Sequence, residues 1–335
     1  YELKLKYRGP TVYFRGLIEI SNVCAKNCLY CGIRCSNSDV HRYSLSEDEI
    51  IEAAKFAYNA GYGSIALQAG ERQDGEFIEK IARVLRKIKS ISSVSNPLGV
   101  TLSLGEQSAD VYKLWKEAGA DRYLLRIEAS DRDLYEKIHP SGSKNHSYQT
   151  RLQALQDLKS LDYLLGTGVM IGLPYQKREN LENDLNFFKE IGVDMVGMGP
   201  YISHEQTPLG RIVALWKSGG GEGVDKGDFW NISREELLDL SIEMIAKLRC
   251  LMPHINIAAT TALQVLDPLG REKGIMAGAN VIMPNITVTE AKQNYNLYQG
   301  KPGLEDDAQV TKEILLKNLS SIGVEVGWGE RGDWR

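Results

Sequence analysis

The chain has 335 residues, with 40 Lys and Arg against 44 Asp and Glu and a formal net charge of −4. This balance excludes the strongly basic surface of a general nucleic-acid-binding or membrane-surface protein. No apolar run reaches the roughly 18 residues of a membrane span, and the first residues lack the apolar core of a secretory signal. We therefore expect one globular domain over residues 1–335, with neither nucleic acid nor membrane as a partner.

Short β-branched or apolar runs alternate along the chain with stretches of helical period. The predicted strands are 16–21, 64–70, 99–104, 122–128, 168–174, 195–200, 255–260 and 280–284. The predicted helices between them are 46–62, 76–89, 109–119, 151–161, 180–192 and 233–249. Ser46 and Glu49 have the spacing of a capping box, so we expect the first of these helices to begin just after Ser46.

One kind of joint recurs between helix and strand, as AGAD at 118–121, IGVD at 191–194 and AGAN at 277–280, with AGYG at 60–63 as a looser version. Glycine at this place takes the left-handed turn that ends a helix. Eight strands alternating with helices predict a complete (β/α)8 TIM-type barrel, with active-site groups at the carboxyl ends of the strands. The rival, an open doubly wound sheet, lacks support because the first βα turn has no GxGxxG fingerprint.

Three segments fall outside this alternation. Residues 1–15 are expected as an N-terminal extension, and residues 285–335 as a C-terminal segment that closes the base of the barrel. Residues 215–231 are Gly-rich, polar and too long for an ordinary connection. They are either a flexible surface insertion or, alternatively, a lid or partner-docking loop.

Four of the five cysteines lie within CAKNCLYCGIRC at 24–35, directly after the first predicted strand. Three thiolates on one short loop, Cys24, Cys28 and Cys31, can hold three corners of a 4Fe–4S cluster. The fourth iron is then open to the amino and carboxylate groups of a cofactor. A cluster with Cys35 as fourth ligand and a structural zinc site are the alternatives. So few cysteines outside the cluster do not form a disulfide framework, which favours a reducing cytoplasm.

CxxxCxxC with an aromatic residue before the last cysteine resembles the signature of the radical S-adenosylmethionine (radical SAM) superfamily. Within it, the chain is similar to the HydE family of FeFe-hydrogenase maturases, which is related to biotin synthase, methylornithine synthase and HmdB. The similar stretches are SNVCAKNCLYCGIR, LQAGE, TLSLGE, EAGADRYLLRIE, MVGMGPYISH, ATTA, GANVIMPN and NLYQGK. The resemblance implies a 4Fe–4S cluster and S-adenosylmethionine as cofactors.

The resemblance also implies roles for single residues. Cys24, Cys28 and Cys31 would ligate the cluster, which leaves one iron open. The residues implied to bind S-adenosylmethionine are Tyr30, Gly32 and Ile33 on the adenine side, Gln68 over the cluster, Glu128 at the ribose or amino group, Arg151 at the carboxylate, and Met195 or Met198 near the adenosyl group. Core packing is the alternative for the two methionines.

Polar residues on the inner face of the strands predict an anionic or strongly polar substrate, because unpaired arginines inside a barrel are costly. Alternate positions of a strand share a face. The candidates read in this way are Thr101 with Ser103, Arg122 with Arg126, and Thr260 with Thr261. Tyr295 and Tyr298 join them by the resemblance, as residues lining a cavity below the barrel. A salt bridge of Arg122 or Arg126 with Glu128 or Asp121 is the alternative.

The function implied is a step of H-cluster maturation. A 5′-deoxyadenosyl radical would attack the sulfur of a cysteine-bound Fe(CO)2CN complex supplied by the maturase HydG, with the product passed toward HydF. Cys250 is the single cysteine outside the loop, so we expect no second cluster, which argues against biotin synthase. The alternative is a related radical SAM enzyme acting on a small amino-acid or pyridinol-precursor substrate, as methylornithine synthase or HmdB does. A cluster carrier without turnover is the non-enzymatic alternative, and it would not need Gln68, Glu128 and Arg151.

Overall fold

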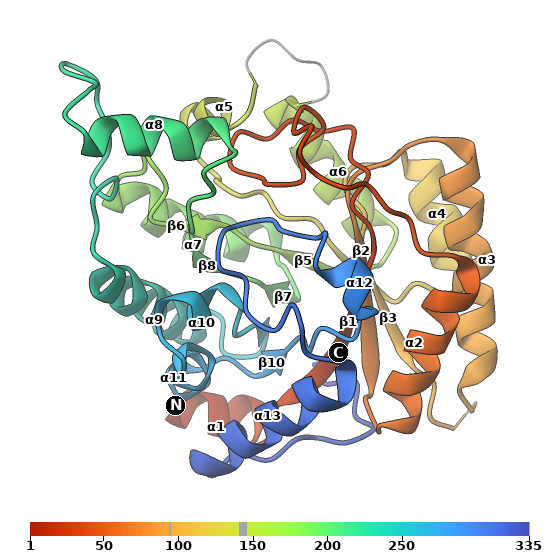
Figure 1. The fold of residues 1–335 in the computed structure, drawn as a ribbon. Coiled ribbons are helices and arrows are strands. Elements are labelled where there is room, and N and C mark those ends of the chain that lie inside the picture. The colour runs from red at the N-terminus through yellow and green to blue at the C-terminus, as the bar shows by residue number, and fades with distance from the viewer. Residues whose placement is uncertain (94, 141–145, 335) are drawn as a thin grey trace.

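The computed structural model describes residues 1–93, 95–140 and 146–334. Its main sheet is parallel throughout and has the strand order β10-β1-β2-β3-β4-β5-β7-β9 (Figure 1). A bridge between Ala258 and Val281, with Ala259 N donating to Val281 O at 2.9 Å, joins the last strand of this order to the first. The ring closes, and the prediction of an eight-stranded barrel is confirmed.

The strands are longest at the start of the chain and become short later. They are β1 (Tyr13–Ser21), β2 (Ser64–Ala69), β3 (Gly99–Ser103), β4 (Arg122–Leu124), β5 (Leu164–Thr167), β7 (Met195–Val196), β9 (Asn256–Ile257) and β10 (Val281–Ile282). Beyond β5 and β7 the chain continues as β6 (Met170–Ile171) and β8 (Gly199–Pro200), which pair with each other. At the interruption Gly168 faces Gly197 so closely that a Cβ on Gly168 would lie 2.0 Å from the Gly197 carbonyl oxygen.

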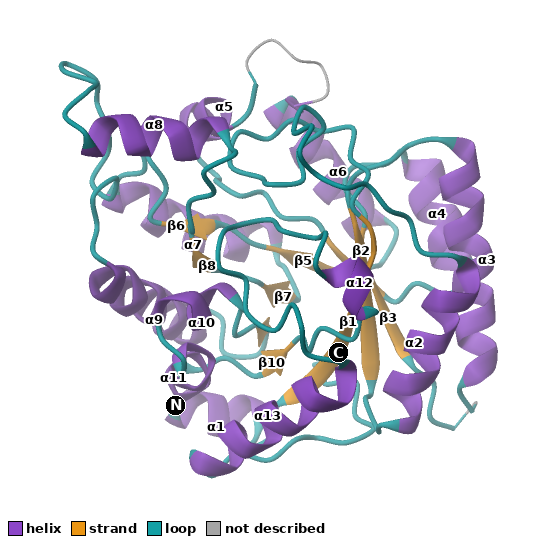
Figure 2. Cartoon of the chain, in the orientation of Figure 1, coloured by secondary structure: helices purple, strands orange, loops and turns teal. Residues whose placement is uncertain are grey.

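Helices cover the outside of the barrel (Figure 2). The helices of the described residues, including those at the two ends of the barrel, are α1 (Glu2–Arg8), α2 (Glu47–Asn59), α3 (Gly75–Ile91), α4 (Ala109–Glu117), α5 (Arg132–Ile138), α6 (Tyr148–Ser160), α7 (Arg178–Ile191), α8 (Pro208–Lys217), α9 (Arg234–Leu251), α10 (Ala262–Leu266), α11 (Gly270–Ala277), α12 (Thr289–Lys292) and α13 (Ala308–Ser321). The predicted joints are confirmed, since Gly61, Gly119, Gly192 and Gly278 follow α2, α4, α7 and α11 with φ of 83°, 117°, 66° and 128°.

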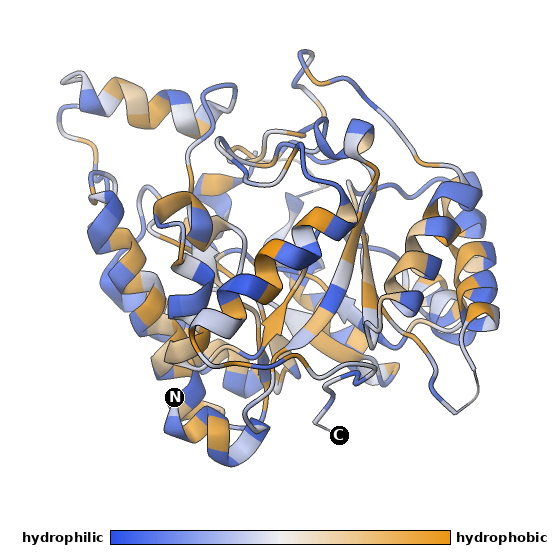
Figure 3. Ribbon diagram, turned by 60° about the horizontal axis from the view of Figure 1, so that its bottom comes forward, coloured by the Kyte–Doolittle hydropathy of each residue, from blue (hydrophilic) through white to orange (hydrophobic). Residues whose placement is uncertain are grey.

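The core lies between the strands and the inner faces of these helices. In α3 the buried residues Phe77, Ile81, Leu85 and Ile88 recur at the helical period and face the barrel. Hydrophilic and hydrophobic residues alternate along the helices in the same way in Figure 3. None of the helices in the described part of the chain is long and apolar enough to cross a membrane.

The C-terminal segment, residues 285–334, contacts both ends of the barrel. Residues 285–303 run along the carboxyl ends of the strands, where Asn285 bridges Leu17 and Thr287 Oγ1 accepts from Glu19 N at 2.8 Å. After α13 the chain lies at the opposite end, where Val326 bridges Val12. Residues 215–231 begin as the end of α8, and the chain then folds back so that Lys226 Nζ lies 4.5 Å from the centre of the Trp230 ring.

Both hydrogen bonds of the predicted capping box are present at the start of α2. Ser46 Oγ accepts from Glu49 N at 3.2 Å, and Glu49 Oε2 accepts from Ser46 N at 2.6 Å. We expect Ser46→Ala to lower the free energy of unfolding by about 1 kcal/mol, because one amide at the helix start loses its acceptor. Urea unfolding measures the change, with Ser320→Ala on an exposed face of α13 as control. Equal stability of the two variants would contradict this account of the cap.

Candidate active site

The cysteine loop follows the carboxyl end of β1, where barrel enzymes carry their active sites. Cys24, Cys28 and Cys31 are half-buried. Burial raises the pKa of the Cys28 thiol to about 12. The pKa of Cys31 lies well above its ordinary value because of burial, and then because of the neighbouring Cys28 and Cys24. Three thiols with raised pKa values resist ionisation, and a positively charged metal centre relieves that cost by binding them as thiolates.

The spacing of these thiols suits several irons better than one. Among the described residues, Cys28, His139 and His146 have ligand atoms that all lie within 4.8 Å of one another. The three cysteines do not form such a compact group. Ligands of a cluster sit on separate iron atoms and are more widely spaced than the ligands of one zinc ion. Cys35 is exposed, with its sulfur 3.9 Å from Ser36 Oγ. The residues present therefore fit a cluster held by three cysteines.

Close packing against the next strand fixes the first cysteine. Cys24 Sγ accepts hydrogen bonds from Lys26 N at 3.4 Å and Glu71 N at 3.3 Å. A Cβ on Gly70 would lie 2.4 Å from the Val23 carbonyl oxygen and 2.7 Å from the Cys24 Cβ. Only glycine at the end of β2 lets the loop come this near.

The far side of the loop packs against the segment after β10. Gly32 N donates to Leu297 O at 2.9 Å, and a Cβ on Gly32 would lie 2.0 Å from the Asn296 carbonyl oxygen. Ile33 is buried, and Tyr30 has its hydroxyl 3.3 Å from His139 Nε2. The loop is thus enclosed by chain that lies more than 260 residues away in sequence.

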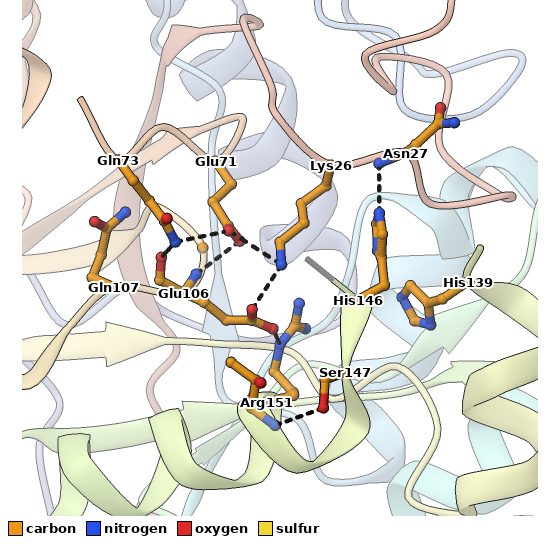
Figure 4. A network of polar contacts seen from close by, with 12 residues as sticks. Lys26, Asn27, Glu71, Gln73, Glu106, Gln107, His139, His146, Ser147 and Arg151 are labelled. Carbon is orange, nitrogen blue, oxygen red and sulfur yellow. Dashed lines mark hydrogen bonds and ion pairs between the residues drawn. The ribbon is translucent and has the colours of Figure 1, made fainter. Parts of the chain in front are cut away.

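A buried ion-pair network anchors the middle of the loop (Figure 4). Lys26 Nζ lies 2.7 Å from Glu106 Oε2 and 3.3 Å from Glu71 Oε1, and Arg151 Nε lies 2.5 Å from Glu106 Oε1. The four side chains are between 4% and 9% exposed. Two cations and two carboxylates cancel in charge, so each buried ion has a partner within the network.

Arg151 occupies the centre of this network from the first turn of α6. Its guanidinium also donates to the Arg126 carbonyl oxygen, while residues 141–145 of the loop before it lie outside the described residues. The residue predicted to bind a cofactor carboxylate therefore also positions Glu106, and through Glu106 the loop residue Lys26.

Arg126 and Glu128 form a salt bridge, which is the alternative to substrate binding that the sequence left open for Arg126. The two contacts, Nε to Oε1 at 2.9 Å and Nη2 to Oε2 at 3.0 Å, are bidentate. Arg126 Nη1 also donates to Gly197 O at 2.5 Å. Glu128 has a φ of +66°, a conformation that costs a non-glycine residue about 1–3 kcal/mol. Such strain persists where the surroundings hold a residue in place, and it is common at active sites.

Further predicted residues lie at the same end of the barrel. Gln68 Nε2 donates to Tyr295 Oη at 3.3 Å. Thr260 Oγ1 donates to Met198 O at 3.3 Å, and Thr261 Oγ1 accepts from Arg271 Nη2 at 2.9 Å. Ser103 is half-buried where β3 ends. Burial raises the pKa of Tyr298 above its ordinary value, which keeps its hydroxyl protonated.

Three predicted residues are not brought to the cysteines. Arg122, Thr101 and Met195 line a cavity of about 10 Å³, room for about one water, near the other end of the barrel. There Arg122 pairs with Asp333, with contacts of 2.7 and 2.5 Å, and Arg15 Nη1 lies 2.8 Å from the Met195 sulfur. Arg122 thus has an ion-pair partner other than Asp121 or Glu128.

Sequence reasoning missed the residues that support the loop, which are Lys26, Glu71, Glu106, His139 and His146. One signal could have found the two glutamates. A Gly-Glu pair directly follows β2 and again follows β3, as Gly70-Glu71 and Gly105-Glu106. Neighbouring parallel strands end side by side, so two carboxylates in matching positions predict a shared cation.

Lys26→Met tests the network. The change leaves Glu71 and Glu106 with less compensation in a dry site, so we expect the free energy of unfolding of the metal-free chain to fall by about 3–5 kcal/mol. Urea unfolding measures it. Lys113→Met is the matched control, because the exposed pair of Lys113 with Glu117 at 4.0 Å contributes less than about 1 kcal/mol. A loss in K26M no larger than in K113M would contradict the role given to the network.

Comparison with known proteins agrees with this site. A family model described as the Radical SAM superfamily matches residues 18–188. The chain is 40% identical over 333 residues to the FeFe hydrogenase maturase subunit HydE of Thermotoga maritima. This match covers 98% of this chain and 86% of that protein. It is 28% identical over 325 residues to the 3-methylornithine synthase of Methanosarcina acetivorans, covering 95% and 81% of the two chains.

A likeness in fold accompanies these identities. The crystal structure of methylornithine synthase (PylB) matches with a TM-score of 0.77 at 22% identity, over 98% of this chain and 87% of that one. The cysteine loop at the carboxyl end of a closed parallel barrel, the family match and the 40% identity over nearly the whole chain together show that this radical SAM enzyme belongs to the HydE family of FeFe-hydrogenase maturases.

Proposed function

We propose that the chain carries out the HydE-type step in assembly of the FeFe-hydrogenase active site. The observation that carries the proposal is the 40% identity to a HydE over 98% of the chain, joined to three cysteines at the carboxyl end of the barrel. Cys24, Cys28 and Cys31 would hold a 4Fe–4S cluster. When bound, the cluster and S-adenosylmethionine supply a 5′-deoxyadenosyl radical.

The residues around the loop suit a zwitterionic cofactor. Arg151 offers a planar guanidinium to a carboxylate, and the Glu128 carboxylate offers an acceptor to an amino group or ribose hydroxyl. Tyr30, Gly32, Ile33 and Gln68 would complete the site. Arg151 is held by its ion pair with Glu106, and Glu128 is held by its ion pair with Arg126. Both charged groups are therefore pre-oriented, which lowers the entropy lost on binding.

The substrate we propose is a cysteine-bound Fe(CO)2CN complex supplied by HydG. The 5′-deoxyadenosyl radical would form a bond to the cysteine sulfur while the bond between that sulfur and the cysteine carbon breaks, and the reduced iron product would pass toward HydF. Arg126 would line the substrate side of the site with its charge balanced by Glu128, while Ser103, Thr260, Thr261, Tyr295 and Tyr298 supply hydroxyls at the same end of the barrel. The segment 285–303 crosses this end of the barrel and would keep water from the reacting groups.

An anaerobic reconstitution tests the proposal. The iron-loaded chain receives S-adenosylmethionine, a reductant and a synthetic cysteine-bound iron dicarbonyl cyanide complex. Formation of an adenosylated low-valent iron species, detected by EPR and product analysis, would support the proposal. Cleavage of S-adenosylmethionine with no change of the complex would overturn the substrate and favour the methylornithine synthase-like or HmdB-like alternative. A fully loaded cluster that leaves S-adenosylmethionine intact would favour the carrier.

Cysteine variants separate the ligands from their neighbour. We expect Cys24→Ser, Cys28→Ser and Cys31→Ser each to abolish the roughly four irons per chain of a reconstituted cluster, because three thiolates are the minimum that anchors it. Cys35→Ser should keep the iron content and the EPR signal of the unchanged chain. Iron analysis and EPR measure both. Loss of the cluster in C35S would revive the four-cysteine alternative.

Arg151→Ala tests the cofactor site. Loss of the guanidinium should weaken S-adenosylmethionine binding by about tenfold or more. The iron content should stay unchanged, because Lys26 in the cysteine loop still pairs with Glu71 and Glu106. Arg151→Lys should not restore binding fully, because an ammonium lacks the planar pair of donors. Anaerobic calorimetry measures the affinity, with the exposed Arg132→Ala as control. Unchanged affinity in R151A would remove Arg151 from the cofactor site.

A further inference from the structure

Two histidines stand against the middle cysteine, and the proposed function does not use them. His139 is 2% exposed and His146 is 7% exposed. A ring nitrogen of each and Cys28 Sγ all lie within 4.8 Å of one another. Figure 4 shows both rings beside the network that anchors the loop, with His146 pointing at Asn27. Histidines this near a thiolate ligand act on it even without binding the metal themselves.

A single backbone contact fixes the tautomer of His146. Asn27 N lies 2.9 Å from His146 Nε2, and a backbone amide can only donate. Nε2 therefore accepts, and the proton of the neutral ring is on Nδ1. Burial, and after it the neighbouring Lys26, lower the pKa of His146 to about 4. Because Asn27 directly precedes Cys28, this hydrogen bond holds the backbone of a proposed cluster ligand.

His139 backs this arrangement. Its Nδ1 lies 2.8 Å from the Tyr135 carbonyl oxygen, which can only accept, so the proton of this ring is also on Nδ1. Its Nε2 lies 3.3 Å from the hydroxyl of Tyr30, a residue that stands between the second and third cysteines in the sequence of the loop. The ring stacks on Tyr135 at 4.0 Å and lies 5.6 Å from the His146 ring. His146 therefore cannot turn away from the loop without disturbing a packed wall.

We propose that His146 is a positioning residue of the cluster, which holds Cys28 through the Asn27 amide and so helps to set the reduction potential of the cluster. The inference rests on the proposed function, because it needs the cluster on Cys28. The potential of an iron–sulfur cluster depends on the hydrogen bonds and the solvent exposure of its sulfurs. The hydrogen bond from Asn27 N to His146 Nε2 fixes the backbone next to Cys28 and so the surroundings of its sulfur.

His146→Leu removes both ring nitrogens but leaves an apolar side chain that keeps water out. We expect the equilibrium constant for reduction of the cluster to change about tenfold, which is about 59 mV for a one-electron couple. His146→Gln keeps an acceptor within reach of Asn27 N, and we expect it to lie nearer the unchanged protein. A redox titration followed by EPR on anaerobically reconstituted protein measures the potential, with the exposed His254→Gln as matched control.

A shifted potential in H146L that H146Q partly restores supports the inference, as does a loss of bound iron in H146L that H146Q restores. The inference would be overturned if the equilibrium constants for cluster reduction in H146L and in the unchanged chain differed by less than about twofold. Should H146L fail to fold, H146Q and H146N are compared instead. The Asn amide lies one bond nearer the backbone than the Gln amide and so reaches Asn27 N less well. Equal reduction potentials of these two variants would overturn the inference. Unchanged protein that takes up no cluster would overturn the proposed function as well.

Discussion

The ion pairs of Lys26 with Glu71 and Glu106 are the constraint on which the cysteine loop depends. Residues 22–43 contain no helix and little strand, so regular backbone hydrogen bonding does not hold them in place. A lysine inside the loop, which reaches carboxylates at the ends of β2 and β3, helps to fix their position. Removing one partner of such a buried pair is costly, and the cost makes the loop rigid before any cofactor arrives.

The same network joins the cluster loop to the rest of the active site. Arg151 on α6 pairs with Glu106 and donates to the backbone of Arg126, which in turn pairs with the strained Glu128. A displacement of the loop would therefore be felt at the groups proposed to hold the cofactor. The opposite end of the barrel is separate, and there Asp333 of the C-terminal tail pairs with Arg122 close to Arg15.

Local patterns were enough to predict the barrel, the capping box at Ser46 and the place of the cysteines, because each depends on residues near one another in sequence. Position along a strand was harder. Alternation shows which face of a strand a side chain is on, but not how near it lies to the carboxyl end, so Thr101, Arg122 and Met195 were grouped with residues from the other end of the barrel. Lys26, His139 and His146 were not predicted, because their partners Glu106, Tyr30 and Asn27 lie far from them in sequence.

Maturation of a hydrogenase in vitro tests the HydE assignment most directly. FeFe hydrogenase lacking its active-site cofactor is incubated anaerobically with HydG, HydF, their substrates and the iron-loaded chain, and hydrogen evolution is then measured. The account predicts activity that depends on the chain and disappears when C28S replaces it. A chain with a full cluster that cleaves S-adenosylmethionine but adds no hydrogen evolution would contradict the assignment.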